Sequence, residues 1–291
     1  MFSLQACLWR NFTVQRRFLG KFAHSHKKSS RASFNLKGSR LTKHFLFSVG
    51  FTGCTMIGGS AYENFSSSSK QKLSRYQLID FTSLQNNVDR INLSHKIAIG
   101  ITALNFAIWL GLRKSASMRH FFEVAAHSRR SSSLILAAFN HANFIHFAVN
   151  MFVFNNIFPN VSHSLGPAQT LAFYLSAACW SSFGSIVYKT LASVHIASVG
   201  ASGAVYALVG FICYEFPSTP FAIIFLPSFT FTAASLFKGA IVFETLGMIS
   251  RISLLDHAAH LSGLLFGYMY AAEGRKLYKA VKHYVCRILD R

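Results

Sequence analysis

Acidic residues are scarce in this chain: Asp and Glu together number 9 against 29 Lys and Arg, and the formal net charge is +20. Charged residues make up only 13% of the sequence, whereas a typical soluble domain carries about 25%. A nucleic-acid binder would place its basic residues on a folded polar face, but here they gather in the tails and between long apolar runs. The composition therefore excludes a nucleic-acid partner and indicates a membrane protein.

Motifs for metal binding and for disulfide bonding are also missing. The five cysteines include no Cys-x-x-Cys pair, and the histidines lack the glutamate of a His-Glu-x-x-His metalloprotease motif. Paired aspartates are absent from the apolar runs, since only Asp256 falls at the edge of one. We therefore expect no metal and no cofactor, and an aspartyl protease mechanism is excluded.

The N-terminal segment contains no acidic residue before Glu63, although ten lysines and arginines precede it. Arg-rich, Ser-rich and acid-free N-termini are typical of mitochondrial presequences, whose basic amphipathic helix responds to a membrane potential. The alternative is an ordinary basic tail that obeys the positive-inside rule. A secretory signal is disfavoured because Met1 to Thr42 lacks a long apolar core.

Seven apolar segments approach the length of about 20 residues that a membrane span needs. They are Phe45–Tyr62, Ile97–Leu112, Asn143–Phe158, Ala168–Tyr188, Ile196–Tyr214, Thr230–Ile249 and Leu254–Ala272. We therefore predict an all-α membrane protein, a polytopic helical bundle with one N-terminal transmembrane helix and a six-helix core.

The same pattern divides the chain into five parts. Residues 1–42 form the presequence or basic tail, 43–62 the extra transmembrane helix, 63–96 a linker, 97–273 the six-helix core, and 274–291 a basic C-terminal tail. More lysines and arginines fall on the N-terminal side of the seven spans, which places that side in the matrix if the protein is mitochondrial.

Two segments between the spans have a predicted character of their own. Arg113–Ser133 is a polar, basic connection whose amphipathic middle contains Phe121 and Phe122, and we expect this middle to lie in the membrane interface. Three prolines flank or interrupt Phe221–Leu226 and confine it to a loop or a re-entrant piece.

A serine beside glycines is the first candidate for chemistry. Gly200 and Gly203 flank Ser202 inside an apolar run, and they leave its hydroxyl and backbone N–H open to a reacting carbonyl. Polar groups in hydrocarbon are costly and usually functional. The alternative is a packing seam of small residues between helices.

Histidines supply the second candidate. His260 precedes Gly263 and Gly267, which form a small-residue face that approaches a neighbouring helix. If that neighbour carries Ser202, His260 is its general base, because serine is a poor nucleophile until an imidazole takes its proton. The alternative is a core histidine bonded to a backbone carbonyl, and His257 could compete for the role of base.

Further polar residues could complete the site. His146 and Asn150 are four residues apart and share a helix face, which suits an oxyanion hole or, alternatively, a hydrogen bond between helices. Tyr206 follows Ser202 by four residues and could stack on the base or serve only in packing. Glu244 is an intramembrane carboxylate to which the sequence assigns no partner.

The motifs His-x-x-x-Asn, Gly-x-Ser-Gly with a tyrosine four residues later, and Ala-His-x-x-Gly-x-x-x-Gly occur in this order on three core spans. Together they resemble the rhomboid intramembrane serine proteases. The extra N-terminal helix and the basic presequence look like the mitochondrial, presenilin-associated rhomboid-like branch. The resemblance extends over roughly His120 to Tyr270.

The resemblance implies roles for individual residues. Ser202 is then the nucleophile and His260 its general base and acid, and the pair is a dyad that no carboxylate completes. The oxyanion donors are the Ser202 amide, His146 and Asn150. The supporting residues are Tyr206, Gly200 and Gly203. Ser262 replaces a glycine that many relatives carry, and the Trp-Arg pair of the first core loop is not evident.

The expected function is that of an intramembrane serine endopeptidase of the mitochondrial inner membrane. It would hydrolyse peptide bonds in or near the transmembrane helices of single-span substrates within the bilayer. The alternative is a non-catalytic rhomboid-like protein that binds membrane clients, although the serine and the histidine are both present. A transporter would show inverted-repeat symmetry, which the sequence lacks. The sequence does not indicate an oligomeric state.

Overall fold

The computed structural model describes residues 34–74, 82–223, 226–251 and 255–289. Most of the expected presequence, residues 1–33, lies outside this part, as does Leu254, the predicted start of the last span. Residues up to Arg40 form one unit and Leu41–Arg291 another. The described part of the chain is 79% helical, so the prediction of a mainly helical protein is confirmed.

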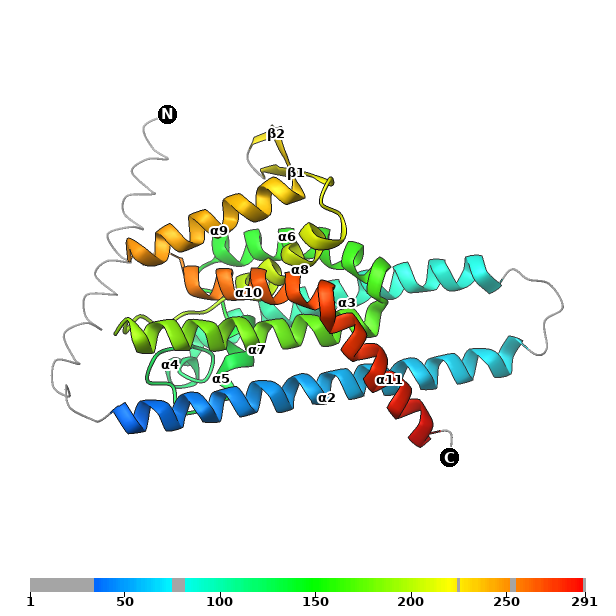
Figure 1. The fold of residues 1–291 in the computed structure, drawn as a ribbon, viewed down its shortest axis with the longest axis horizontal. Helices are drawn as coiled ribbons and strands as arrows, with labels where there is room; N and C mark the ends of the chain where they lie inside the picture. Colours follow the sequence, from blue (N-terminus) through cyan, green and yellow to red (C-terminus); the bar gives the residue numbers. More distant parts are fainter. Residues whose placement is uncertain (1–33, 75–81, 224–225, 252–254, 290–291) are drawn as a thin grey trace. The chain divides into compact units, whose positions relative to one another are not determined.

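The helices and strands follow one another as shown in Figure 1. In chain order they are α2 (Phe34–Ser74), α3 (Thr82–Lys114), α4 (Ala116–Arg119), α5 (Ser133–Leu136), the 3₁₀ turn η2 (Ala137–Phe139), α6 (Phe144–Leu165), α7 (Pro167–Leu191), α8 (Ser202–Glu215), β1 (Pro220–Ile223), β2 (Leu226–Thr232), α9 (Ala233–Ile249), α10 (His257–Met269), the π-helical turn η3 (Tyr270–Gly274) and α11 (Arg275–Leu289).

Two helices in the described part of the chain are long and apolar enough to cross a membrane, Leu93–Lys114 and Pro167–Leu191. Helix α8 is apolar but shorter, because residues 196–201 of the predicted span Ile196–Tyr214 are not helical. The expected linker is also largely helical, since α2 continues to Ser74 and α3 begins at Thr82. Hydropathy therefore located the apolar runs but not the ends of the helices.

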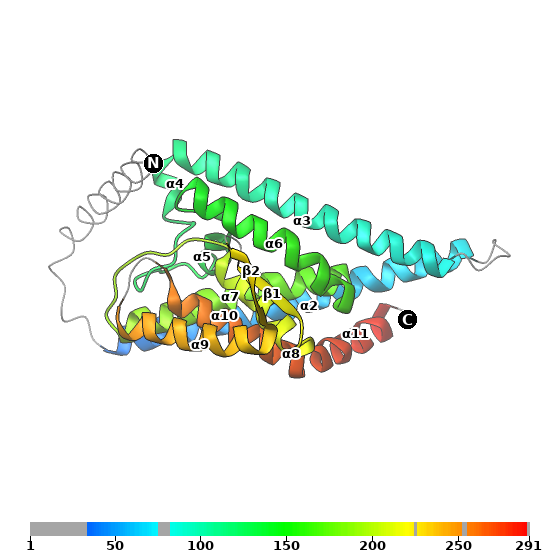
Figure 2. The ribbon, with the colours of Figure 1, turned by 90° about the horizontal axis from the view of Figure 1, so that it is seen from above.

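Helix α10 packs against α7, α8 and α9, and α3 packs against α6 (Figures 1 and 2). The contact of α10 with α8 is close because of glycines. A Cβ on Gly263 would overlap the carbonyl oxygen of Gly203, and one on Gly267 would overlap that of Ala207. Small residues let two helix backbones touch. The seam predicted for Gly263 and Gly267 thus joins α10 to the helix that begins with Ser202.

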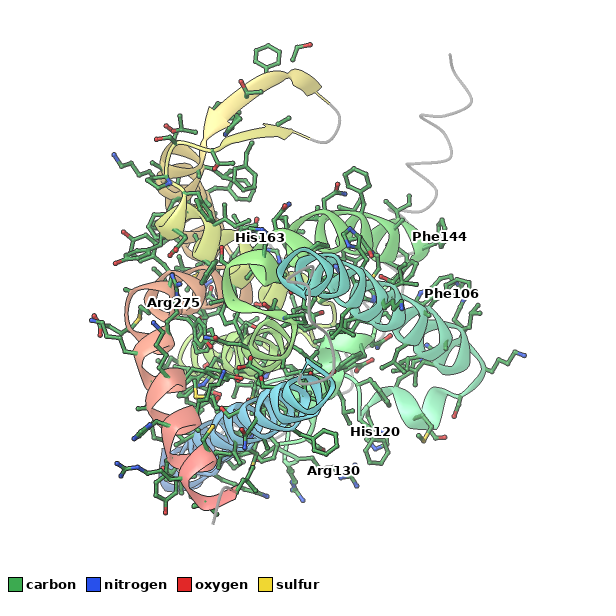
Figure 3. All side chains as sticks on the ribbon, turned by 90° about the vertical axis from the view of Figure 1, so that its right-hand side faces the viewer. Phe106, His120, Arg130, Phe144, His163 and Arg275 are labelled. Atoms are coloured by element: carbon green, nitrogen blue, oxygen red, sulfur yellow. The ribbon has the colours of Figure 1, made fainter. Side chains whose placement is uncertain are left out.

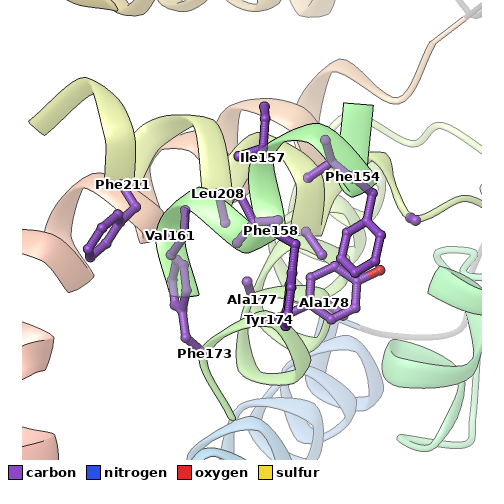
Figure 4. Packing of buried hydrophobic residues seen from close by; sticks show 14 of the residues in the cluster. Phe154, Ile157, Phe158, Val161, Phe173, Tyr174, Ala177, Ala178, Leu208 and Phe211 are labelled. Atoms are coloured by element: carbon purple, nitrogen blue, oxygen red, sulfur yellow. The ribbon is translucent and has the colours of Figure 1, made fainter. Parts of the chain in front are cut away.

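Aromatic residues fill the core between α6 and α7. The Phe154 and Tyr174 ring centroids lie 4.8 Å apart, and those of Phe154 and Phe158 lie 5.1 Å apart (Figure 4). All three side chains are fully buried. Large aromatic side chains contribute much of the apolar area that stabilises such a core. The core fixes α6, and therefore His146 and Asn150, beside α7 and α8.

A two-stranded hairpin interrupts the helical pattern. Strands β1 and β2 are antiparallel, Phe221 pairs with Phe231, and a bulge falls between Ala222 and Ile223. The prediction of an all-α fold is wrong here, as is the loop or re-entrant piece at Phe221–Leu226. The predicted span from Thr230 also begins within β2. Aromatic and β-branched residues alternate along β2, which favours a strand.

The basic connection Arg113–Ser133 consists mostly of turns and irregular backbone. Helix α4 covers only Ala116–Arg119, and turns follow it. Arg130 donates to His120 over 3.1 Å, and the two residues lie close together in this loop (Figure 3). The guanidinium of Arg130 also lies 4.1 Å from the Phe121 ring centroid. The aromatic and basic side chains in the middle of this connection therefore pair with each other within a turn-rich loop.

Candidate active site

Ser202 is the first residue of α8, and Gly200 determines how the chain reaches it. Gly200 has a φ of +132°, a backbone conformation that residues other than glycine rarely adopt. A Cβ there would also lie 2.7 Å from Cε1 of His146. The first amides of a helix have no acceptor within the helix, so they are available to an incoming group. Gly200 thus places the Ser202 hydroxyl and the amides at the start of α8 beside the His146 ring.

Ser202 and His260 meet across the glycine seam. The Ser202 Oγ and the His260 Nε2 are 2.8 Å apart. Tyr206, one turn along α8, stacks on His260 with ring centroids 4.4 Å apart and an interplanar angle of 6°. The structure therefore brings together the serine, the histidine and the tyrosine that the motifs singled out. A hydroxyl within hydrogen-bond reach of an imidazole, itself held by a third group, is the geometry of an activated nucleophile.

His146 and Asn150 both belong to α6, and it is the His146 ring that reaches the turn before Ser202. The imidazole of His146 is packed against Gly200, whereas the Asn150 amide donates to the backbone oxygen of His146 over 2.8 Å. His141, in the loop before α6, is a further residue of this region that the motifs did not single out. Its Nε2 accepts a long, 3.5 Å hydrogen bond from the Ala201 amide. Burial, with a smaller effect of His146, lowers the pKa of His141 to about 3, so this ring is a neutral acceptor.

The Glu244 side chain contacts two histidines of α10, one of which is His260. Its fully buried carboxylate places Oε1 3.2 Å from the Nδ1 of His260 and Oε2 2.6 Å from the Nδ1 of His257. The prediction that no carboxylate lies near the dyad is therefore wrong. Glu244 belongs to α9, and only the packing of α9 on α10 brings it to the histidines.

A buried ion pair supports the start of α10. The Asp256 Oδ1 accepts from the Ala259 amide over 3.1 Å and so caps the helix, while its Oδ2 lies 3.0 Å from the Nζ of Lys189. Lys189 also donates to the Ser198 hydroxyl and to the Val124 carbonyl. The network connects α7, the loop before Ser202 and the helix that carries His260.

Ser262 replaces a glycine of the related motif without disturbing this arrangement. Its side chain lies against Gly184 on α7, where a Cβ would overlap the Ser262 hydroxyl. The absent side chain of Gly184 therefore provides the space that Ser262 occupies.

Trp109 and Arg113, four residues apart on α3, form a cation–π pair with the guanidinium 4.8 Å from the ring centroid.

The chain is similar in sequence to known proteins over most of its length. A family model described as Rhomboid domain matches residues 128–276. The presenilin-associated rhomboid-like protein, mitochondrial, of Mus musculus is 33% identical over 256 residues, which cover 81% of this chain and 68% of the mouse protein. The Homo sapiens protein of the same name is 34% identical over 256 residues, covering 81% and 67%. Rhomboid protein 1, mitochondrial, of Saccharomyces cerevisiae is 30% identical over 140 residues, covering 47% and 40%.

Proposed function

This chain belongs to the rhomboid family, and on that basis we propose that it is an intramembrane serine endopeptidase with Ser202 as nucleophile and His260 as general base. The observation that carries the proposal is the 2.8 Å contact between the Ser202 Oγ and the His260 Nε2. The substrates would be single-span membrane proteins, cleaved in or near their transmembrane helices.

The reaction follows from these positions. His260 takes the hydroxyl proton while Ser202 Oγ attacks the carbonyl carbon of the peptide bond. The negative charge that develops on the carbonyl oxygen is stabilised by the Ser202 amide and by the side chains of His146 and Asn150. His260 then gives its proton to the leaving amine, and water hydrolyses the acyl-enzyme by the same two proton transfers. For this, one N–H of the Asn150 side-chain amide donates to the oxyanion while the other keeps its hydrogen bond to the backbone oxygen of His146.

A membrane location is supported by the outer faces of several helices. Large apolar side chains are exposed along them, including Leu46 on α2, Ile99 on α3 and Leu246 on α9, which are 62%, 63% and 56% exposed. Such apolar faces suit lipid. Because the relatives are named mitochondrial, we place the chain in the mitochondrial inner membrane as a seven-span protein. Its N-terminal end would face the matrix and α11 the intermembrane space.

The second candidate function is a non-catalytic rhomboid-like protein that binds membrane clients. Labelling in membranes by a serine-directed fluorophosphonate separates the two. An enzyme with an activated Ser202 is labelled, and Ser202→Ala removes the label. A client-binding protein without an activated serine stays unlabelled in both forms. Absence of labelling in the wild type, with the protein present and folded, would contradict the proposal.

A further inference from the structure

Two imidazoles of one helix converge on the carboxylate of Glu244. His257 and His260 both belong to α10, and the Tyr206 ring of α8 stacks on that of His260. The side chain of Glu244 is 0% exposed. A buried carboxylate is costly unless hydrogen bonds compensate it, so such an arrangement is seldom retained by chance. The proposed dyad alone does not use it.

We propose that Glu244 is a positioning residue that acts through His260 and turns the dyad into a relay of serine, histidine and glutamate. The proposal rests on the function proposed above for Ser202 and His260. His257 has a part in it as the second donor, which fixes the orientation of the carboxylate.

The carboxylate of Glu244 selects one tautomer of His260. A carboxylate only accepts hydrogen bonds, so the 3.2 Å contact with Oε1 requires the proton of the neutral ring to be on Nδ1. Nε2 then carries a lone pair and accepts from the Ser202 hydroxyl over 2.8 Å. This is the only neutral form in which His260 can act as a base toward Ser202. Without the carboxylate, the ring could place its proton on Nε2 and lose that ability.

The carboxylate also serves the charged state of the base. When His260 receives the serine proton on Nε2, the ring becomes an imidazolium with its Nδ1–H still directed at Glu244. The negative carboxylate stabilises this cation without itself taking the proton. The proton thus moves from Ser202 to His260 and later to the leaving amine, and Glu244 remains ionised throughout.

His257 holds the other oxygen of the carboxylate. Its Nδ1 lies 2.6 Å from Oε2, while its Nε2 is buried and has no hydrogen-bond partner among the described residues. The His257 ring is packed against Gly247 on α9, where a Cβ would overlap it. The ring is therefore fixed in place. With Oε2 bound to His257, Oε1 is directed at His260.

Cleavage of a single-span model substrate by the purified full chain in proteoliposomes tests the inference. Glu244→Gln keeps the shape but presents a neutral amide, and we expect kcat to fall by about 10²- to 10⁴-fold with little change in KM. Glu244→Asp keeps the charge and should retain more activity than the glutamine variant. Glu215→Gln is the matched control, because Glu215 pairs with Arg275 at the far end of α8 and its loss should leave kcat unchanged.

The outcomes separate the inference about Glu244 from the function proposed for Ser202 and His260. If Ser202→Ala abolishes cleavage but Glu244→Gln cleaves at the wild-type rate, the inference is wrong and the proposed function stands. If Ser202→Ala still cleaves, the proposed function itself is wrong. Equal losses in the glutamine and aspartate variants, measured per folded protein, would show that a carboxylate at this position does not preserve the rate and would also overturn the inference.

A variant at His257 gives a test that does not change the carboxylate. His257→Phe keeps a flat ring against Gly247 but removes the donor to Oε2, and we expect kcat to fall by about 3- to 10-fold, the effect of one hydrogen bond. His257→Gln can still donate and should lie between this variant and the wild type. A wild-type kcat in His257→Phe would contradict the role of His257. If the Glu244 variants fail to fold, this pair decides the inference.

Discussion

The ammonium of Lys189 and the carboxylate of Asp256 form an ion pair 3.0 Å long, with side chains only 4% and 12% exposed. The pair connects the C-terminal end of α7 to the N-cap of α10. Lys189 also bonds the Ser198 hydroxyl, four residues before Ser202. One buried network thus holds the loop before Ser202 and the start of the helix that carries His260.

Lys189→Met should destabilise the protein strongly. Removing one partner of a buried pair leaves an uncompensated charge, which costs about 3–5 kcal/mol in the free energy of unfolding. Denaturant titration in detergent micelles measures this. Lys276→Met is the control, since Lys276 and Glu273 form a pair in which both side chains are 74% exposed. If both variants unfold at the same midpoint, the buried network does not stabilise the fold.

His146→Ala should lower kcat by about 10²- to 10³-fold and change KM less, because an oxyanion donor acts mainly in the transition state. Asn150→Ala should have the same direction of effect. Asn156→Ala is a matched control on the same helix, since Asn156 is exposed and donates to the Phe152 oxygen four residues back. If the first two variants melt earlier while the rate per folded enzyme is unchanged, these residues only connect or stabilise helices.

Gly267→Ala should destabilise the contact of α10 with α8 by about 1–3 kcal/mol, because its methyl group would overlap the Ala207 carbonyl oxygen and force the backbones apart. Gly239→Ala on α9 is the control. No heavy atom lies within 4 Å of a Cβ at that position, so the substitution should be tolerated or slightly stabilising. Thermal unfolding checks both. Equal melting temperatures for Gly267→Ala and the wild type would show that α8 and α10 are not as close as described.

Residues 1–40 should direct a soluble reporter into mitochondria. The segment is basic and contains no acidic residue, so the membrane potential can drive its import. Fractionation and loss of the presequence on import provide the readout. The matched control changes the lysines and arginines of the segment to glutamine, which should leave the reporter in the cytosol. Delivery of the unaltered fusion to the endoplasmic reticulum would contradict the mitochondrial assignment.

Local spacing in the sequence predicted which side chains come together around Ser202. The glycines around Ser202 and after His260 indicated close helix packing, and the structure places the two side chains within hydrogen-bond distance. Tyr206 lies one turn from Ser202, so its position also follows from helical periodicity. Periodicity constrains residues on one helix and says little about which face of another helix they meet.

Glu244 shows where that information ends. It is 16 residues from His260, on a separate helix, and no spacing rule connects them. The signal available in the sequence was the free-energy cost of placing Glu244 in an apolar segment, because a carboxylate there usually has a function. The hairpin was missed for a different reason. Hydropathy alone does not separate a short apolar strand from the start of a helix, although the alternation along Phe229–Thr232 favours a strand.

The most direct test of the account is cleavage of a single-span substrate by the purified protein and by its Ser202→Ala, His260→Ala and double variants in proteoliposomes. The wild type should cleave, each single variant should be inactive while remaining folded, and the double variant should be no worse than either, because the two residues act as a unit. Ser262→Ala, a serine on α10 that lies against Gly184, should retain activity. Substantial turnover by Ser202→Ala would contradict the central claim.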